Sequence, residues 1–120
     1  MLDISIDRIG RLGIVECQGR IVRSEAAFKL RRAVMSLRHS QFIVLDLSEV
    51  TACEGGGLGM LVFLERWAHD QSIQLRVFNP RKAVRARLEL IRSIQPINAV
   101  SLQEMMTLLA DANSDLAVAA

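Results

Sequence analysis

An apolar run that is closed by an acid and followed shortly by three glycines constrains most strongly what this chain can fold into. Residues 42–47 read Phe-Ile-Val-Leu-Asp-Leu, and a strand of this composition has almost no face that prefers water. Such a strand is typical of a parallel sheet that is covered on both sides, which requires crossover helices. Gly55, Gly56 and Gly57 then separate this strand from an apolar helix that we expect to end near Asp70.

The flanking segments alternate between strand-like and helix-like patterns. Residues 2–6 and 12–17 have strand character around a turn containing glycine, which predicts an antiparallel hairpin. Ser24, Asn79–Pro80 and Ser101 with Glu104 are typical helix starts. The further elements expected are helices at 24–38, 80–91 and 101–112 and strands at 73–78 and 97–100.

This order predicts an α/β fold. We expect one domain over residues 1–112 and a flexible C-terminal tail over residues 113–120. The sheet should be mixed, with four or five strands and with helices mainly on one side.

Composition excludes several classes of protein. With 51% apolar and 23% charged residues, the chain is neither disordered nor membrane-spanning, and we expect a cytoplasmic protein without a signal peptide. A net charge of +2 and 4% aromatic residues argue against a nucleic-acid partner. Cys17, Cys53, His39 and His69 lack ligand spacing, and no catalytic constellation is present, so we expect no metal, no cofactor and no enzymatic activity.

The stretch LDLSEVTACEGGGLGML, residues 45–61, resembles the signature of the STAS domain family of bacterial anti-sigma factor antagonists. That signature reads Leu-Asp-Leu-Ser-Gly-Val-Thr, two apolar residues, then Asp-Ser-Ser-Gly-Leu-Gly. Residues 77–90, VFNPRKAVRARLEL, also resemble a strand, cap and helix of the family. The positions that match the signature without a gap are Leu45, Asp46, Leu47, Ser48, Val50, Thr51, Gly57, Leu58 and Gly59.

The departures from the signature concern its regulatory residue. In the family, the first serine of Asp-Ser-Ser-Gly caps the helix and accepts phosphate from a partner serine kinase, which disrupts binding through added charge. Here Gly55 occupies that position, Gly56 the second serine and Glu54 the aspartate. The resemblance therefore implies a member without the usual phosphorylation switch. Thr51 and Ser48 are the nearest hydroxyls, and we expect them to serve the hydrogen bonding of the loop.

Three interpretations of the segment Glu54–Gly57 remain open, and the first is favoured. The domain binds its partner constitutively; or Glu54 supplies a fixed negative charge in place of phosphate; or the glycines form an anion-binding nest at a helix N-terminus. Glycines that merely permit a tight turn are compatible with the first interpretation.

The helix after the glycines carries apolar residues on a second side. Met60, Phe63 and Trp67 follow helical spacing, and in the family this helix faces the partner while the positions of Phe63 and Trp67 are usually polar. We expect these three to form a partly exposed apolar patch, with burial in the core as the alternative. The basic residues at 81–92 are expected to be a solvated face, with an acidic partner or a phosphate backbone as the alternatives.

The resemblance implies a non-catalytic protein-interaction module. Its implied partner is a GHKL-type serine kinase that acts as an anti-sigma factor and is sequestered by the module, which releases a sigma factor. The alternative is a structural subunit of a lipid-transport ABC complex or a stress-signalling scaffold, where the exposed aromatics would join a permanent complex or a homodimer. The residues expected to bind the partner are Glu54, Gly55, Gly56, Gly57, Met60, Phe63 and Trp67.

Overall fold

The structure, a computed structural model, describes residues 1–94 and 96–119, with side chains described through residue 113. Its element order confirms the one expected from sequence. The elements are β1 (Leu2–Ile9), β2 (Leu12–Ile21), α1 (Ser24–Met35), β3 (Phe42–Cys53), α2 (Gly56–Asp70), β4 (Gln74–Phe78), α3 (Lys82–Leu90), β5 (Ala99–Val100) and α4 (Leu102–Ala119).

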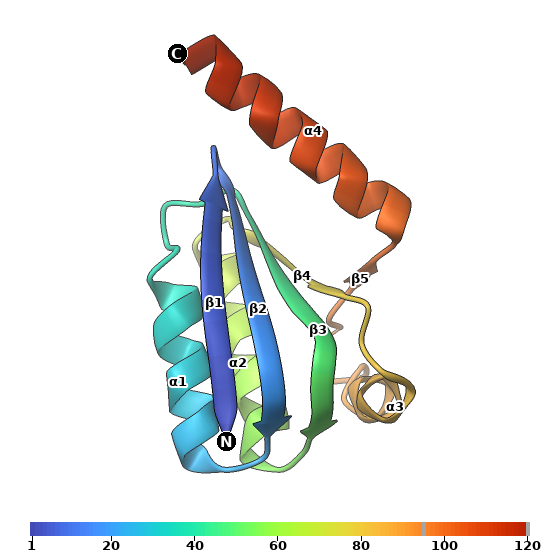
Figure 1. The fold of residues 1–120 in the computed structure, drawn as a ribbon. Helices are drawn as coiled ribbons and strands as arrows, with labels where there is room; N and C mark the ends of the chain where they lie inside the picture. Colours follow the sequence, from blue (N-terminus) through green and yellow to red (C-terminus); the bar gives the residue numbers. More distant parts are fainter. Residues whose placement is uncertain (95, 120) are drawn as a thin grey trace.

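The strands form one mixed sheet in the order β1-β2-β3-β4-β5 (Figure 1). β1 and β2 are an antiparallel hairpin, whereas β2, β3, β4 and β5 pair in parallel. The predicted hairpin and the mixed sheet are both confirmed. β3 lies between two parallel neighbours, as its apolar sequence predicts.

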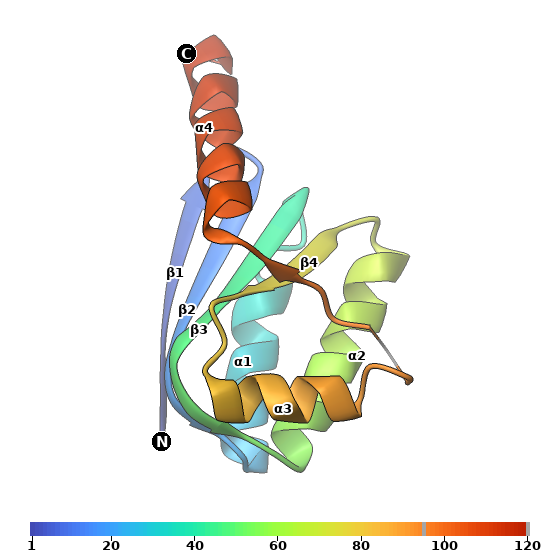
Figure 2. The same cartoon turned by 90° about the vertical axis from the view of Figure 1, so that its right-hand side faces the viewer.

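Helices α1, α2 and α3 lie on one side of the sheet and α4 lies on the other (Figure 2). Alternate residues of β3 supply both faces: Leu45 and Leu47 pack into the core under the three helices, whereas Val44 packs towards α4. On the α4 side, Met105 and Ala112 are the buried contacts of the helix. Three of four helices on one side agree with the expected arrangement.

The α4 face of the sheet is covered only in part. In Figure 1, α4 crosses the upper end of the sheet and continues beyond the tips of β1 and β2. Lower on this face, polar residues of β1, β2 and β3 border a shallow hollow of about 140 Å³, among them Asp3, Glu16, Asp46 and Ser48. Polar side chains are expected where no helix shields a sheet from water.

Several element boundaries differ from those predicted. α3 begins at Lys82 rather than at Pro80, because Asn79 adopts a left-handed φ of 50° that ends β4 in a turn. The N-cap position of α1 is Arg23 rather than Ser24. β3 runs to Cys53, well past the predicted end at Leu47.

The start of α4 follows the prediction, whereas its end does not. The backbone N–H of Glu104 donates to the Ser101 hydroxyl at 3.1 Å, and the N–H of Ser101 donates to the Glu104 carboxylate at 3.2 Å. This is the predicted capping box. The helix then continues to Ala119, beyond the predicted end at Ala112. Flexibility of residues 113–120 stays a prediction, and Ala120 lies outside the described residues.

Candidate functional site

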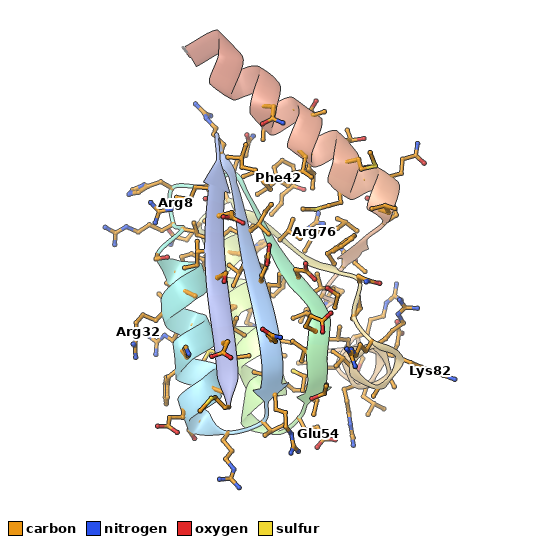
Figure 3. The ribbon with its side chains drawn as sticks, in the orientation of Figure 1. Arg8, Arg32, Phe42, Glu54, Arg76 and Lys82 are labelled. Carbon is orange, nitrogen blue, oxygen red and sulfur yellow. The ribbon has the colours of Figure 1, made fainter. Side chains whose placement is uncertain are left out.

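The loop between β3 and α2 lies at the carboxyl end of the sheet, where Glu54 is labelled in Figure 3. Its backbone is fixed by three hydrogen bonds. The N–H of Glu54 donates to the Ile21 carbonyl at 3.2 Å, the N–H of Gly57 to the Glu54 carbonyl at 2.9 Å, and the N–H of Gly59 to the Gly55 carbonyl at 3.1 Å. The loop is therefore tied both to the end of β2 and to the first turn of α2.

The three glycines of this loop are not equivalent. Gly55, at the N-cap position of α2, has φ 52° and ψ −119°, a conformation that side-chain-bearing residues rarely adopt. A Cβ at Gly57 would lie 1.8 Å from the Ile21 carbonyl oxygen, so this glycine permits α2 to approach β2. A Cβ at Gly56 would meet nothing within 4 Å. The backbone thus favours glycine at the position where the family signature has its phosphoacceptor serine, but not at the next position.

The carboxylate of Glu54 is turned towards α3, where it accepts a 2.7 Å hydrogen bond from the guanidinium of Arg87. Both side chains are about half exposed. Because Arg87 partly neutralises this carboxylate, Glu54 is a weak substitute for a phosphate dianion. A groove of about 430 Å³ runs beside the ion pair and is lined by Thr51, Ala52, Cys53, Glu54, Ala83, Ala86, Arg87 and Leu90.

The polar residues of the signature hold the end of β3 in place. Asp46 accepts hydrogen bonds from the backbone N–H of Ser48, at 3.0 Å, and from the hydroxyl of the same residue. The hydroxyl of Thr51 donates to the Gly19 carbonyl of β2 at 3.4 Å. These bonds accompany shifts in the pairing of β2 with β3. Both hydroxyls form hydrogen bonds, as expected, but within the sheet rather than in the loop that follows β3.

Among the three apolar residues singled out on α2, Phe63 is the exposed one. Its side chain is 43% exposed, and the guanidinium of Arg31 on α1 lies 5.1 Å from the centre of its ring. Met60 and Trp67 are half-buried and pack against the main core. These three residues therefore contribute both to the core and to the surface.

The basic residues around α3 are used in part within the fold. Arg81 donates to the Ser48 carbonyl at 2.9 Å and pairs with Glu49 at 3.4 Å, and Arg92 pairs with Glu89. Arg81 thus connects the start of α3 to the end of β3. The Arg81 side chain is still 50% exposed, so it makes these contacts while remaining part of a solvated face.

Neither cysteine is a nucleophile at neutral pH. Cys17 and Cys53 are free and buried, and burial raises the pKa of each thiol to about 12. The nearby charge of Asp46 acts in the same direction at Cys17, as does that of Glu54 at Cys53. Among the described residues, no group of three or more histidine, cysteine or acidic side chains is placed to hold a metal ion.

Glu65 is a polar residue of interest that the sequence interpretation passed over. Burial raises the pKa of its carboxyl group, although the charges of Arg76 and His69 oppose this shift. Its Oε2 atom is buried and has no hydrogen-bond partner among the described residues. Its burial could have been expected from the sequence, because helical spacing places Glu65 on the same side of α2 as Leu58 and Leu61.

No helix in the described part of the chain is long and apolar enough to cross a membrane.

Comparison with solved structures identifies the same fold in anti-sigma factor antagonists. The antagonist SpoIIAA in its unphosphorylated form superposes with a TM-score of 0.72 over 91% of this chain and 97% of its own, at 12% identity. An antagonist from Mycobacterium paratuberculosis gives a TM-score of 0.73 over 92% of this chain and 95% of its own, at 18% identity. An antagonist described as putative, from Thermotoga maritima, gives 0.72 over 89% and 94%, at 16% identity.

The search of curated proteins gives no significant match. A family model described as "Mlab, STAS domain" matches residues 5–95. This range includes the whole of β2, β3 and β4 and the glycine loop. Because this match covers most of the sequence, the chain belongs to the STAS domain family.

Proposed function

We propose that this chain is a non-catalytic, cytoplasmic module that binds a GHKL-type serine kinase acting as an anti-sigma factor, without the usual serine switch. The observation that carries the proposal is the conformation of Gly55, which stands at the phosphoacceptor position and has a backbone that disfavours serine. Family membership and the shared fold of named anti-sigma factor antagonists support it. Sequestering the kinase would release a sigma factor.

Docking would use the loop Glu54–Gly57 and the start of α2. A backbone hydrogen bond ties the loop to the end of β2, and a loop that is ordered before binding loses less conformational entropy when it binds. Phe63 supplies exposed apolar area about two turns further along α2, and aromatic side chains are frequent anchors of protein interfaces. Met60 and Trp67, which follow the same helical spacing, are half-buried and pack against the core.

Binding would be constitutive. A phosphoserine at the start of α2 would add close to two negative charges at the docking surface, and Gly55 cannot carry one. Glu54 does not reproduce that charge, because its carboxylate is paired with Arg87.

The alternative is a structural subunit of a lipid-transport ABC complex or of a stress-signalling scaffold. The lack of a hydroxyl at Gly55 and Gly56 favours it, because a permanent complex has no need of a phosphorylation switch. Both functions use an apolar docking surface, so the identity of the bound protein distinguishes them.

Affinity capture from the host, followed by mass spectrometry, tests the proposal. Three baits are compared: the wild-type chain, Phe63→Asp, and Met106→Asp as a matched control. Met106 is 62% exposed and lies on α4, across the sheet from α2. A GHKL kinase captured by the wild type and by Met106→Asp, but lost with Phe63→Asp, supports the proposal. An ABC ATPase or scaffold proteins with the same dependence on Phe63 would support the alternative instead.

A further inference from the structure

The exposed aromatic surface on α2 continues onto α1. α1 and α2 each connect one strand to a parallel neighbour, so they run in the same direction, and they lie side by side in Figures 1 and 2. The guanidinium of Arg31 on α1 lies over the ring of Phe63 on α2, so these two residues are at the same level along the paired helices. Phe28 lies one turn before Arg31, as Met60 does before Phe63, and these four residues form what we call the α1–α2 seam.

The seam exposes two large aromatic side chains. Phe28 is 52% exposed and Phe63 is 43% exposed. They come from neighbouring helices, and Arg31, which lies over the ring of Phe63, is one turn from Phe28 on α1, so the exposed apolar area is contributed by two helices rather than one.

Helix α1, which forms one side of the seam, carries an excess of positive charge. The cations of α1 and its two ends are Arg23, Lys29, Arg31, Arg32 and Arg38, against one acid, Glu25. The four ion pairs found among the described residues involve other cations. Lys29 donates to the Leu2 carbonyl, whereas Arg32 points outward from α1 in Figure 3.

We propose that the α1–α2 seam docks an acidic amphipathic segment of a partner protein, with an apolar side chain against Phe28 and Phe63 and carboxylates on Arg31 and Arg32. This rests on the proposed function, since it names the chemistry of the partner beside the glycine loop. An arginine stacked on a ring keeps its N–H groups available at the edge, where carboxylates bind them in pairs. Since Arg31 covers one face of Phe63, a nucleic-acid base has little room to stack there.

The test uses a defined probe: a synthetic helical peptide with leucines on one face and glutamates on the other, and a twin in which every glutamate is glutamine. Binding is followed by the fluorescence of Trp67, the single tryptophan, and by backbone amide shifts in NMR spectra. We expect the acidic peptide to bind and to shift amide signals of α1 and α2 only. Its affinity should fall as the salt concentration rises. The glutamine twin should bind about tenfold more weakly, because it lacks the charge-assisted bonds.

Variants of the protein locate the site. Arg31→Glu and Phe28→Ser should each weaken the acidic peptide about tenfold. Lys82→Glu, the same kind of charge change on the exposed start of α3, should leave the affinity unchanged. Arg32→Glu, at an exposed position, repeats the charge test with little risk to folding.

Three results would overturn the inference. Equal affinities of the protein for the two peptides, or of the wild type and Arg31→Glu for the acidic peptide, would show that charge does not contribute to binding. Self-association that shifts the seam amides would make the occupant a second copy of this chain. Binding to vesicles of phosphatidylcholine and phosphatidylglycerol, in place of the peptide, would make it a membrane surface.

This outcome is separable from that of the proposed function. Should Phe63→Asp abolish capture of the kinase while Arg31→Glu leaves it intact, the proposed function stands and the contribution of α1 is wrong. Should the acidic peptide behave as described while no kinase is captured, the seam stands and the kinase is the wrong partner.

Discussion

Replacing Gly55 with serine measures how strongly the loop excludes the residue that the family signature has there. Gly55 has φ 52° and ψ −119°, and holding a side-chain-bearing residue in so rarely populated a conformation costs about 1–3 kcal/mol. Gly56 provides the matched control, because its Cβ would meet no atom within 4 Å and its φ is not positive. Serine at Gly56 should change the free energy of unfolding by less than about 1 kcal/mol, in the stabilising direction if at all.

The assay is urea unfolding, monitored by far-UV circular dichroism and by the fluorescence of Trp67. With an m value of roughly 2 kcal/mol/M, a loss of about 2 kcal/mol lowers the midpoint by roughly 1 M. Gly57→Ala, whose Cβ would lie 1.8 Å from the Ile21 carbonyl oxygen, should be more damaging than either serine variant. Equal midpoints for Gly55→Ser and Gly56→Ser would refute the argument that the backbone favours glycine at position 55.

Three further predictions concern stability and reactivity. Burial raises the pKa of Glu65, so its ionised form destabilises the fold above the ordinary glutamate pKa; Glu65→Gln should raise the melting temperature at pH 7, with the gain vanishing below about pH 4. Because burial raises the pKa of Cys17 and Cys53 to about 12, a thiol reagent at pH 8 should label the folded protein far more slowly than the urea-unfolded chain; rapid labelling of the folded state would contradict the burial. Ser101→Ala removes one half of the capping box and should lower the free energy of unfolding by about 1 kcal/mol in urea, with faster amide exchange at the start of α4; an unchanged exchange rate would show that the cap is dispensable.

Much of the fold could be predicted from local patterns. The alternation in residues 2–6 and the apolar run at 42–47 were enough to predict the hairpin and the covered parallel strand, because burial on one or two faces leaves a direct record in sequence. The end of β3 could not be predicted in this way. Its later residues mix polar and apolar types without a clear strand pattern, yet they pair with β2 through register shifts that depend on both strands.

The turn before α3 shows a different limit. Asn-Pro is a frequent helix start, but asparagine also tolerates a left-handed backbone, and Asn79 takes that second option. Local residue preferences allow both a helix start and a left-handed turn at Asn79. In the structure the turn is formed, and Pro80 is buried.

At the candidate site, residue identities were visible in the sequence but their constraints were not. The replacement of serine by Gly55 can be read directly, whereas the need for glycine at Gly57 comes from Ile21, far away in the chain. The ion pair of Glu54 with Arg87 and the contact of Arg31 with Phe63 also join distant segments. Only the fold brings such pairs together, so the contribution of α1 to the surface had no local signal.

The central claim is that partner binding by this chain is not switched by phosphorylation. It is tested most directly with the purified kinase captured from the host, by measuring its affinity for the wild-type chain before and after incubation with Mg-ATP, alongside the intact mass of the chain. An unchanged affinity and an unchanged mass are predicted, because Gly55 and Gly56 offer no hydroxyl and the hydroxyls of Ser48 and Thr51 are hydrogen-bonded within the sheet. Phosphate on Ser48 or Thr51, together with weaker binding, would contradict the claim and show that the switch has moved to another residue.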